Sequence, residues 1–509
     1  MTKPNLRAVA LLPLFSSLSF ACMSPTDPEP GTGGTAGSSG SVASGGAGAA
    51  GAGSGGVGKG GSGGVTGGTS GTGAGGSGAG GVAASGGTGA MAGTGMGGTS
   101  AGMAGTAGTN VGGAGGGGGA AGTGMGGTGA IPEGGYPENT GAGCDVMAGP
   151  LAENENLPDP FMMNDGTRIS TKAQWACRRN EIKKDIEKYE IGTKPEPPMV
   201  EASLSGGTLT VEVTTSSGSL TLSSSVGMAS GSGPHCVAIG MNGNAGNISG
   251  CIQIPFRHDQ VVTYAGGSGS HNTGDPFYRV YPDLAGKIGK YNAWSWGISR
   301  LIDGIDQVKD ELNVDMSRIG LQGCSYAGKM ALFGGAFDER VALTVAQESG
   351  GGGITSWRTS QNFTDRTGTD IEKIDNTNGS WFLQSMRSLD PYSLPHDHHE
   401  LIAMIAPRAV IALGNPGYEW LGDESGYKSV MAAKEVFKAL GVESNIGYDF
   451  TGNHGHCQAP TTQQQSVAAF VNKFLKGEDA NTAIEIEPQS NGFDLNWESV
   501  VDWETPVLN

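Results

Sequence analysis

Positively charged and aromatic residues are scarce in this chain of 509 residues. Lysine and arginine number 30 against 48 aspartates and glutamates, so the formal net charge at pH 7 is −18, and aromatic residues make up only 6%. A chain this acidic offers no basic surface on which phosphates could bind, which excludes nucleic acid as a partner. The apolar run at the N-terminus is too short for a membrane-spanning helix.

The first 22 residues read as an export signal. Lys3 and Arg7 precede the apolar stretch Ala8–Phe20, and a cysteine, Cys22, follows. Cys22 is a candidate site for a lipid anchor, although Leu18 stands one position early for a good lipoprotein cleavage box. We therefore expect a protein that is either secreted or anchored at the cell surface or outer membrane.

The next segment has too few apolar side chains for a packed core. Between residues 31 and 130 the chain is almost all Gly, Ala, Ser and Thr, with no aromatic residue and a single charge, Lys59. Such a segment cannot bury enough surface to offset its chain entropy. We predict a disordered linker over residues 23–130, a folded domain over residues 131–480 and a polar tail over residues 481–509.

The residues Gly323–Lys329 place Ser325 at a turn between a predicted strand and a predicted helix. Residues 317–322 read as a short buried strand, and residues 329–333 open the helix. This is the context in which α/β-hydrolases display a serine nucleophile. The spacing Gly-x-Ser-x-x-Gly is one residue longer than the common motif, so the serine alone would also fit a structural role.

A serine nucleophile needs a base and an acid, and α/β-hydrolases carry them in the order Ser, Asp/Glu, His. Glu348 follows the strand-like run Val341–Ala346, so it lies at the carboxyl edge where parallel sheets build their sites. His454 and His456 follow Ile446–Phe450, which reads as the last strand. Both partners of a triad are therefore present in the expected order.

The cysteines favour His456 as the base. Cys324 adjoins Ser325 and Cys457 adjoins His456, so a disulfide between them would bring nucleophile and base within reach of each other. His454 then becomes a polar neighbour. Six cysteines follow Cys22, and in an exported chain an even set is expected to oxidise in pairs. The pairs that we predict are Cys144–Cys177, Cys236–Cys251 and Cys324–Cys457.

In these motifs the chain resembles the glucuronoyl esterases, carbohydrate esterase family 15, whose signature is a Gly-Cys-Ser-x-x-Gly-Lys turn with a glutamate in a Gln-Glu-Ser-Gly stretch. The resemblance spans most of residues 150–475, and with the export signal it suggests a bacterial member. The matching stretches are Trp294-Ser295-Trp296-Gly297, Gln347-Glu348-Ser349-Gly350, Trp357-Arg358, Asp397-His398-His399, Ala406-Pro407-Arg408, Trp420 and His456-Cys457.

The resemblance implies a three-layer αβα sandwich of the serine α/β-hydrolase type, with no metal and no cofactor. It implies Ser325 as nucleophile, His456 as base and Glu348 as acid, with Lys329 and Trp420 in contact with the sugar. The implied reaction is hydrolysis of 4-O-methyl-glucuronate esters that link lignin alcohols to glucuronoxylan in plant cell walls. We expect the enzyme to act as a monomer.

Tyr326 departs from the family pattern. The family usually has an arginine at this position, whose charge helps to stabilise the tetrahedral oxyanion. The backbone N–H of Tyr326 can still donate, but loss of one oxyanion donor typically costs about 10²–10³ in turnover. Arg358 and the tyrosine hydroxyl are two candidates for the missing donor.

The acid and the sugar contacts have alternatives in the sequence. The loop after the predicted strand that ends near Leu413 holds the acid in ordinary α/β-hydrolases, and here it carries Glu419, Asp423 and Glu424. Fungal family members also place a glutamine and a glutamate on the sugar. The residues that this chain offers in that region are Asp370, Glu372 and Asn378.

Two other functions fit parts of the same pattern. One is the removal of other acyl groups, such as acetyl, from polysaccharides. The other is a tethered carbohydrate-binding pseudoenzyme that has lost the oxyanion charge at Tyr326, although an intact Ser325, Glu348 and His456 argue against it.

Three further segments carry structural predictions. The spacing of apolar residues predicts helices over residues 291–312 and 461–475, and Gly206-Gly207 separates two strand-like runs that could form an antiparallel edge. The run His396–Glu400 might be mistaken for a metal site, but it precedes an apolar run and reads as the start of a helix capped by Asp397.

Overall fold

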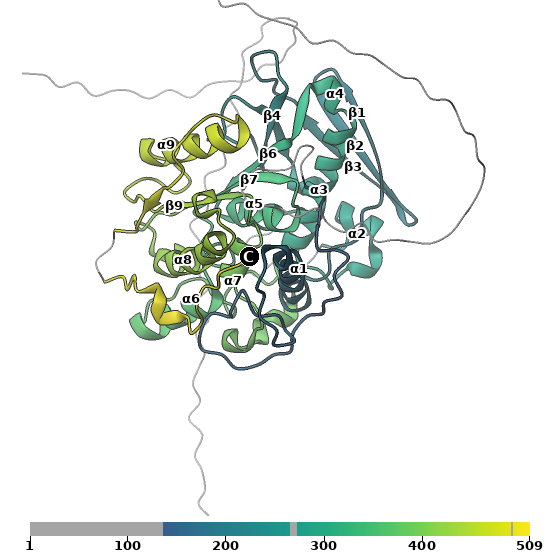
Figure 1. Cartoon of the computed structure of the whole chain (residues 1–509). Helices are drawn as coiled ribbons and strands as arrows, with labels where there is room; N and C mark the ends of the chain where they lie inside the picture. The colour runs from purple at the N-terminus through teal and green to yellow at the C-terminus, as the bar shows by residue number, and fades with distance from the viewer. Residues whose placement is uncertain (1–135, 265–271, 490–491) are drawn as a thin grey trace, which may run out of the picture. The chain divides into compact units, whose positions relative to one another are not determined.

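The computed structural model describes residues 136–509 apart from 265–271 and 490–491 (Figure 1). The export signal with Cys22 and the Gly-rich linker lie outside the described residues. Among the helices of the described part, none has both the length and the apolar character needed to cross a membrane.

A seven-stranded sheet lies at the centre of the domain, with the strand order β10-β9-β8-β7-β6-β4-β5. All neighbouring strands in it are parallel. Every residue of β7 is buried, because a parallel strand in mid-sheet is covered on both faces. The strands are β4 (His235–Met241), β5 (Ile252–Phe256), β6 (Val314–Cys324), β7 (Val341–Gln347), β8 (Ala409–Leu413), β9 (Ile446–Asp449) and β10 (Glu485–Ile486).

Helices cover both faces of this sheet, which makes the predicted three-layer αβα sandwich (Figure 1). The helices on one face are α3 (Lys290–Gln307), α5 (Tyr326–Phe337), α7 (His398–Ala403) and α8 (Asp423–Ala439). On the other face, α9 (Thr461–Phe470) and the π-helical turn Val471–Leu475 bury apolar side chains against β7 and β8. Three further helices are α1 (Trp175–Ile186), α2 (Pro276–Val280) and α6 (Trp357–Thr367).

The two predicted strands around Gly206-Gly207 are antiparallel, but they do not extend the main sheet. With a third strand they form a separate sheet of β1 (Met199–Ser205), β2 (Thr208–Thr215) and β3 (Gly218–Ser225). Every second residue of β2 is buried, including Val211, which packs beside Gly304 of α3. The small sheet therefore covers α3 with one face, as antiparallel sheets often do.

The predicted helices are present with small differences. Residues 291–312 form α3 and, after a break at Val308, the short helix α4 (Lys309–Leu312). The prediction for residues 461–475 is confirmed as α9 and the π-helical turn. The carboxylate of Asp397 accepts a hydrogen bond from the backbone N–H of His398 at 2.8 Å, which confirms the predicted N-cap of α7.

Residues of the polar tail pack onto the domain. The sequence analysis predicted that the strand near residues 446–449 is the last in the chain. This prediction was wrong, because β10 follows it and pairs with β9. Lys428 of α8 forms an ion pair with Asp494 at 2.9 Å, and the indole N–H of Trp503 donates to the carbonyl of Leu157 at 2.9 Å. A two-residue strand has no periodicity to detect, which explains the error.

The three predicted disulfides are present.

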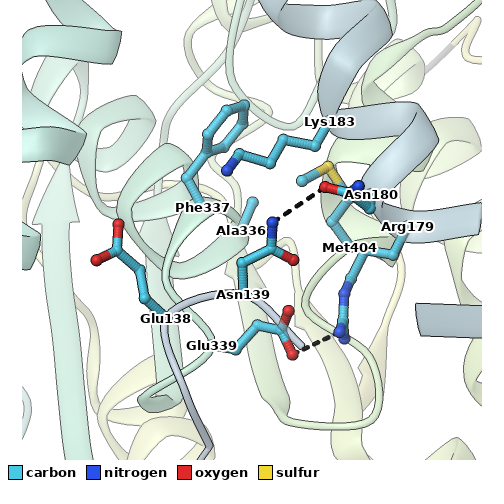
Figure 2. Close-up of a pocket in the computed structure, with 9 residues that line it drawn as sticks. All are labelled: Glu138, Asn139, Arg179, Asn180, Lys183, Ala336, Phe337, Glu339 and Met404. Carbon is cyan, nitrogen blue, oxygen red and sulfur yellow. Dashed lines mark hydrogen bonds and ion pairs between the residues drawn. The ribbon is translucent and has the colours of Figure 1, made fainter. Parts of the chain in front are cut away.

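The first described residues dock on α1, where the amide of Asn139 donates to Asn180 at 3.0 Å and Arg179 pairs with Glu339 (Figure 2). The cavity beside them measures about 10 Å³. It lies at the C-terminal end of α5, near Phe337, and a helix of 12 residues is ~18 Å long. This cavity is therefore remote from the N-terminus of α5, where Ser325 lies.

Candidate active site

The carboxyl ends of four neighbouring strands finish level with one another. Cys324 pairs in register with Gln347, Gln347 with Leu413, and Leu413 with Asp449. The hydrogen bonding continues for one more residue, since the N–H of Glu348 donates to the carbonyl of Leu413 at 2.7 Å. The loops that follow these strands therefore meet at one edge of the sheet, where α/β proteins bind their ligands.

Ser325 occupies a sharp turn between β6 and α5. Its φ of 59° and ψ of −128° lie in a region that residues other than glycine rarely adopt. Two glycines permit this turn, because a Cβ on Gly323 would clash with the carbonyl group of Ala327 and a Cβ on Gly328 would lie 2.5 Å from the carbonyl oxygen of Gln347. Ala327 takes the place of the usual glycine and is buried. The longer spacing therefore still gives the partly exposed serine of a nucleophile turn.

Glu348 and His456 are hydrogen-bonded to each other. Oε2 of Glu348 lies 2.7 Å from Nδ1 of His456, and Oε1 accepts the backbone N–H of Cys457 at 3.1 Å. Glu348 is 1% exposed, whereas the His456 side chain is 17% exposed. A buried carboxylate that accepts Nδ1–H fixes the tautomer in which Nε2 can take a proton.

The disulfide between Cys324 and Cys457 joins the serine turn to the histidine loop. Its Cα atoms are 5.6 Å apart, and a ring nitrogen of His456 lies within 4.8 Å of both sulfurs. The bond therefore holds Ser325 and His456 in neighbouring positions. It also consumes both sulfurs, which cannot then act as thiolate ligands for a metal ion.

His454 has a different environment from His456. Its Nε2 lies 2.8 Å from the carbonyl of Thr451, and its Nδ1 is 3.9 Å from the Glu348 carboxylate. Its ring is thus tied to its own loop, as expected for a polar neighbour.

Two site residues were not found from the sequence. Nδ2 of Asn415 lies 3.5 Å from Oε2 of Glu348 and donates to the carbonyl of His454 at 3.0 Å. The hydroxyl of Tyr418 accepts the backbone N–H of His456 at 3.0 Å. Both residues lie in the loop directly after β8, and that position at the sheet edge was the signal that could have identified them.

The three alternative acids have other surroundings. Burial raises the pKa of Asp423 to about 7, and the negative charge of Glu348 adds to this rise. Glu424 is paired with two cationic side chains, and Glu419 accepts a hydrogen bond from a threonine at 3.3 Å. In the described part of the chain, none of the three forms a hydrogen bond or an ion pair with His456.

The two expected sugar contacts lie close to the triad residues. Nζ of Lys329 is 2.8 Å from the carboxylate of Glu372 and 5.2 Å from the centre of the Trp381 ring. Trp420 is 44% exposed, and its ring centre is 5.0 Å from that of His456. An exposed indole therefore lies beside His456, and a cation paired with a carboxylate follows Ser325 by about one turn of α5.

Arg358 is not the missing oxyanion donor. It is 1% exposed, pairs with Asp397 at 3.2 Å and donates to the carbonyl of His396 at 3.1 Å, so its guanidinium is part of the core around α7. Asp370 forms an ion pair with Lys373 at 2.9 Å. The side chain of Asn378 accepts the N–H of Ser380 at 2.9 Å. Of the three residues considered for the sugar site, Glu372 is thus the one paired with Lys329.

Comparison with known proteins identifies relatives of this chain. A family model described as glucuronyl esterase of fungi matches residues 211–441. A 4-O-methyl-glucuronoyl methylesterase from Thermothelomyces thermophilus is 40% identical over 349 residues, covering 66% of this chain and 85% of the relative. An enzyme of the same name from Schizophyllum commune is 37% identical over 374 residues, covering 70% and 92%.

Solved structures agree with these sequences. The glucuronoyl esterase catalytic domain from Hypocrea jecorina superposes with a TM-score of 0.65 at 36% identity, covering 70% of this chain and 98% of that domain. A serine-to-alanine mutant of the Sporotrichum thermophile enzyme, in complex with methyl 4-O-methyl-β-D-glucopyranuronate, has a TM-score of 0.65 at 35% identity, covering 72% and 100%. The chain belongs to the glucuronoyl esterase family, carbohydrate esterase family 15, and has its α/β-hydrolase fold.

Proposed function

We propose that this protein is a serine esterase that hydrolyses glucuronoyl esters, in which 4-O-methyl-glucuronate on xylan is esterified to a lignin alcohol. The observation that carries the proposal is the 2.7 Å hydrogen bond between Glu348 and His456, beside the turn that displays Ser325. The named relatives are methylesterases of the same sugar acid, and one solved relative binds its methyl ester.

The first half of the reaction forms an acyl-enzyme. Oγ of Ser325 attacks the ester carbonyl while Nε2 of His456 takes the serine proton. Glu348 stabilises the imidazolium that forms. The N–H of Tyr326, at the first position of α5, supports the oxyanion together with the positive end of the helix dipole. The tetrahedral intermediate then expels the alcohol, which receives its proton from His456.

The second half releases the acid. Water attacks the glucuronoyl-Ser325 ester as His456 takes a proton from it, and collapse of the second intermediate returns that proton to Ser325. The products are the alcohol and a free glucuronate. Atoms and protons therefore balance with no group beyond the triad and water.

The Lys329–Glu372 ion pair supplies a donor and an acceptor for sugar hydroxyls. An ester of glucuronate is uncharged at its reacting carboxyl, so the acidic chain does not repel that part of the substrate. The exposed face of Trp420 suits the C–H surface of a pyranose ring. Lys329, Glu372 and Trp420 thus bind and orient the sugar, while the triad acts on the ester.

The N-terminal signal residues support a location outside the cell. We propose a bacterial, monomeric enzyme that is either secreted or anchored through a lipid on Cys22, because a cysteine directly after an export signal is where bacterial lipoproteins carry their anchor. A linker of 100 Gly-rich residues would have a root-mean-square span of roughly 50–60 Å. Such a reach would let an anchored enzyme act on nearby cell-wall polymers.

The substrate is tested with the purified full chain on two esters. One is methyl 4-O-methyl-glucuronate and the other is an acetylated xylo-oligosaccharide. Cleavage of the uronate ester supports the proposal. Cleavage of acetyl groups alone would replace it with deacetylation of polysaccharides, and silence of a folded protein on both esters would favour a carbohydrate-binding pseudoenzyme.

A further inference from the structure

Tyr326 takes part in a chain of side-chain hydrogen bonds next to the nucleophile. It is the first residue of α5 and follows Ser325 directly. Its hydroxyl accepts a hydrogen bond from Nδ2 of Asn242 at 2.8 Å and lies 3.2 Å from Nε2 of His258. The tyrosine is thus bonded to residues that follow two other strands, β4 and β5.

Asn242 lies in the loop directly after β4. It follows β4, the neighbour of β6 in the sheet, and in α/β-hydrolases the loop after this strand supplies the second oxyanion N–H. Its φ is 63°, and its own N–H donates to the carbonyl of Phe256 at 3.0 Å. The N–H of Ala245 donates to Gln253 at 3.1 Å. Gly243 and Asn244 lie between these two residues, so by analogy with that loop we assign the second oxyanion donor to one of their N–H groups.

His258 fixes the direction in which the tyrosine hydroxyl points. Its side chain is buried, burial lowers the pKa of its imidazole, and Nδ1 lies 3.0 Å from the carboxylate of Asp259. Nδ1 makes no hydrogen bond there, but the negative charge of Asp259 favours the tautomer with the proton on Nδ1, in which Nε2 accepts the hydroxyl proton of Tyr326. The ring of Tyr264 packs on Tyr326 with centres 4.3 Å apart and limits its movement.

These contacts assign the hydroxyl a use other than donation to the oxyanion. Its proton is directed at His258 and one lone pair at Asn242. The side chain therefore connects the start of α5, which carries one oxyanion N–H, to the turn after β4, which carries the other.

We propose that Tyr326 and Asn242 are positioning residues: their side-chain hydrogen bond fixes the Asn242–Asn244 turn against the N-terminus of α5 and holds the two backbone oxyanion donors at a constant separation. This inference rests on the proposed esterase function. Preorganised N–H groups stabilise an oxyanion without any charge, because they need no reorganisation during the reaction. Rigid neutral donors thus stand in for the family's arginine.

A double-mutant cycle with Tyr326→Phe and Asn242→Gly tests the proposal. Glycine keeps the left-handed backbone of residue 242 available, and phenylalanine keeps the ring packing. Each change should lower kcat by about 10-fold and leave KM within about 2-fold, since the interaction acts on the transition state. The double variant should lose no more than either single variant, because both remove the same bond.

Three other outcomes would overturn the proposal. A large loss in Tyr326→Phe with none in Asn242→Gly would make the hydroxyl itself the oxyanion donor. Losses that multiply in the double variant, or no loss in any variant, would show that the bond positions nothing. Tyr427→Phe is the matched control, because it removes a tyrosine hydroxyl that also forms a hydrogen bond. Tyr427 lies on α8, and its hydroxyl donates to Glu487 at 3.1 Å. The kcat of this variant should equal that of the wild type.

The cycle is measured on whichever ester the wild type cleaves. A wrong substrate assignment would then appear in the wild-type reaction, whereas a wrong positioning role would appear only in the ratios between variants. Melting temperatures of all four proteins separate loss of folding from loss of kcat.

Discussion

The carboxylate of Glu348 bonds to two groups of the loop that carries His456. One oxygen lies 2.7 Å from Nδ1 of His456, and the other accepts the N–H of Cys457 at 3.1 Å. The acid therefore fixes both the tautomer of the imidazole and the course of the backbone beside it. The disulfide from Cys457 to Cys324 extends this connection to the residue before the nucleophile.

Glu348→Gln should lower kcat by about 10³–10⁴, the loss seen when a triad acid becomes an amide and the imidazole takes the wrong tautomer. Steady-state kinetics on the uronate ester measure it. Asp423→Asn is the matched control, because Asp423 is also buried near the site and its pKa is raised to about 7. Its kcat at pH 6 should stay within about 10-fold of the wild type, and the reverse ranking would make Asp423 the acid.

Replacing Cys324 and Cys457 by serine should lower kcat as well as stability, because this disulfide aligns the nucleophile with the base. The control is the double serine variant of Cys236 and Cys251, which lie away from the triad at the start of β4 and before β5. Chain entropy predicts losses of about 5 kcal/mol for the 133-residue separation and about 3 kcal/mol for the 15-residue separation. Denaturant unfolding checks the stabilities. Equal kcat values in the two folded variants would contradict the aligning role.

Lys329→Ala should lower kcat/KM on the uronate ester by about 10–100-fold, since it removes the buried cation that we propose as a sugar contact and leaves Glu372 unpaired. Lys309→Ala serves as the control, because Lys309 forms an ion pair of similar length, 2.9 Å to Asp306, on an exposed surface. Kinetics that do not change in Lys329→Ala would place the sugar elsewhere.

The carboxylate of Glu190 should stabilise the fold at pH values above its ordinary pKa, and this contribution should be lost in acid. Burial alone would raise its pKa, but the attraction of His398 and the hydrogen bonds from His396 and His398 lower it from 4.5 to about 2. A lowered pKa gives stability that is complete above about pH 4.5 and is lost as the pH falls towards 2. At pH 5 the free energy of unfolding of the wild type should exceed that of Glu190→Gln by about 3 kcal/mol. Urea unfolding from pH 5 to pH 2 measures the difference, which should shrink with falling pH; a constant gap would mean that the carboxylate is not charged in the fold.

The sequence predicted those parts of the site that follow directly from a strand end. Ser325 and Glu348 each lie within three residues of the end of a predicted strand, and the neighbouring cysteines pointed to His456. The structure places these residues together because the strands finish level at one edge of the sheet. Local patterns and one topological rule are sufficient at these positions.

The remaining contacts join segments that no spacing rule connects. Asn242 and Tyr326 are 84 residues apart, and His258 is 68 residues from Tyr326. Arg358 follows the family's pattern in sequence, but only the packing around Asp397 shows that its charge is used in the core. β10 was missed because its two residues pair with β9 without a pattern of their own. Tertiary packing decides all three cases.

The most direct measurement compares the wild type with Ser325→Ala on methyl 4-O-methyl-glucuronate, with the melting temperature of each protein recorded in parallel. The account predicts that the variant melts within about 2 °C of the wild type, since the change removes one partly exposed hydroxyl, and that its hydrolysis falls to the rate in buffer. Wild-type hydrolysis by a folded Ser325→Ala protein would show that another residue is the nucleophile and would contradict the account.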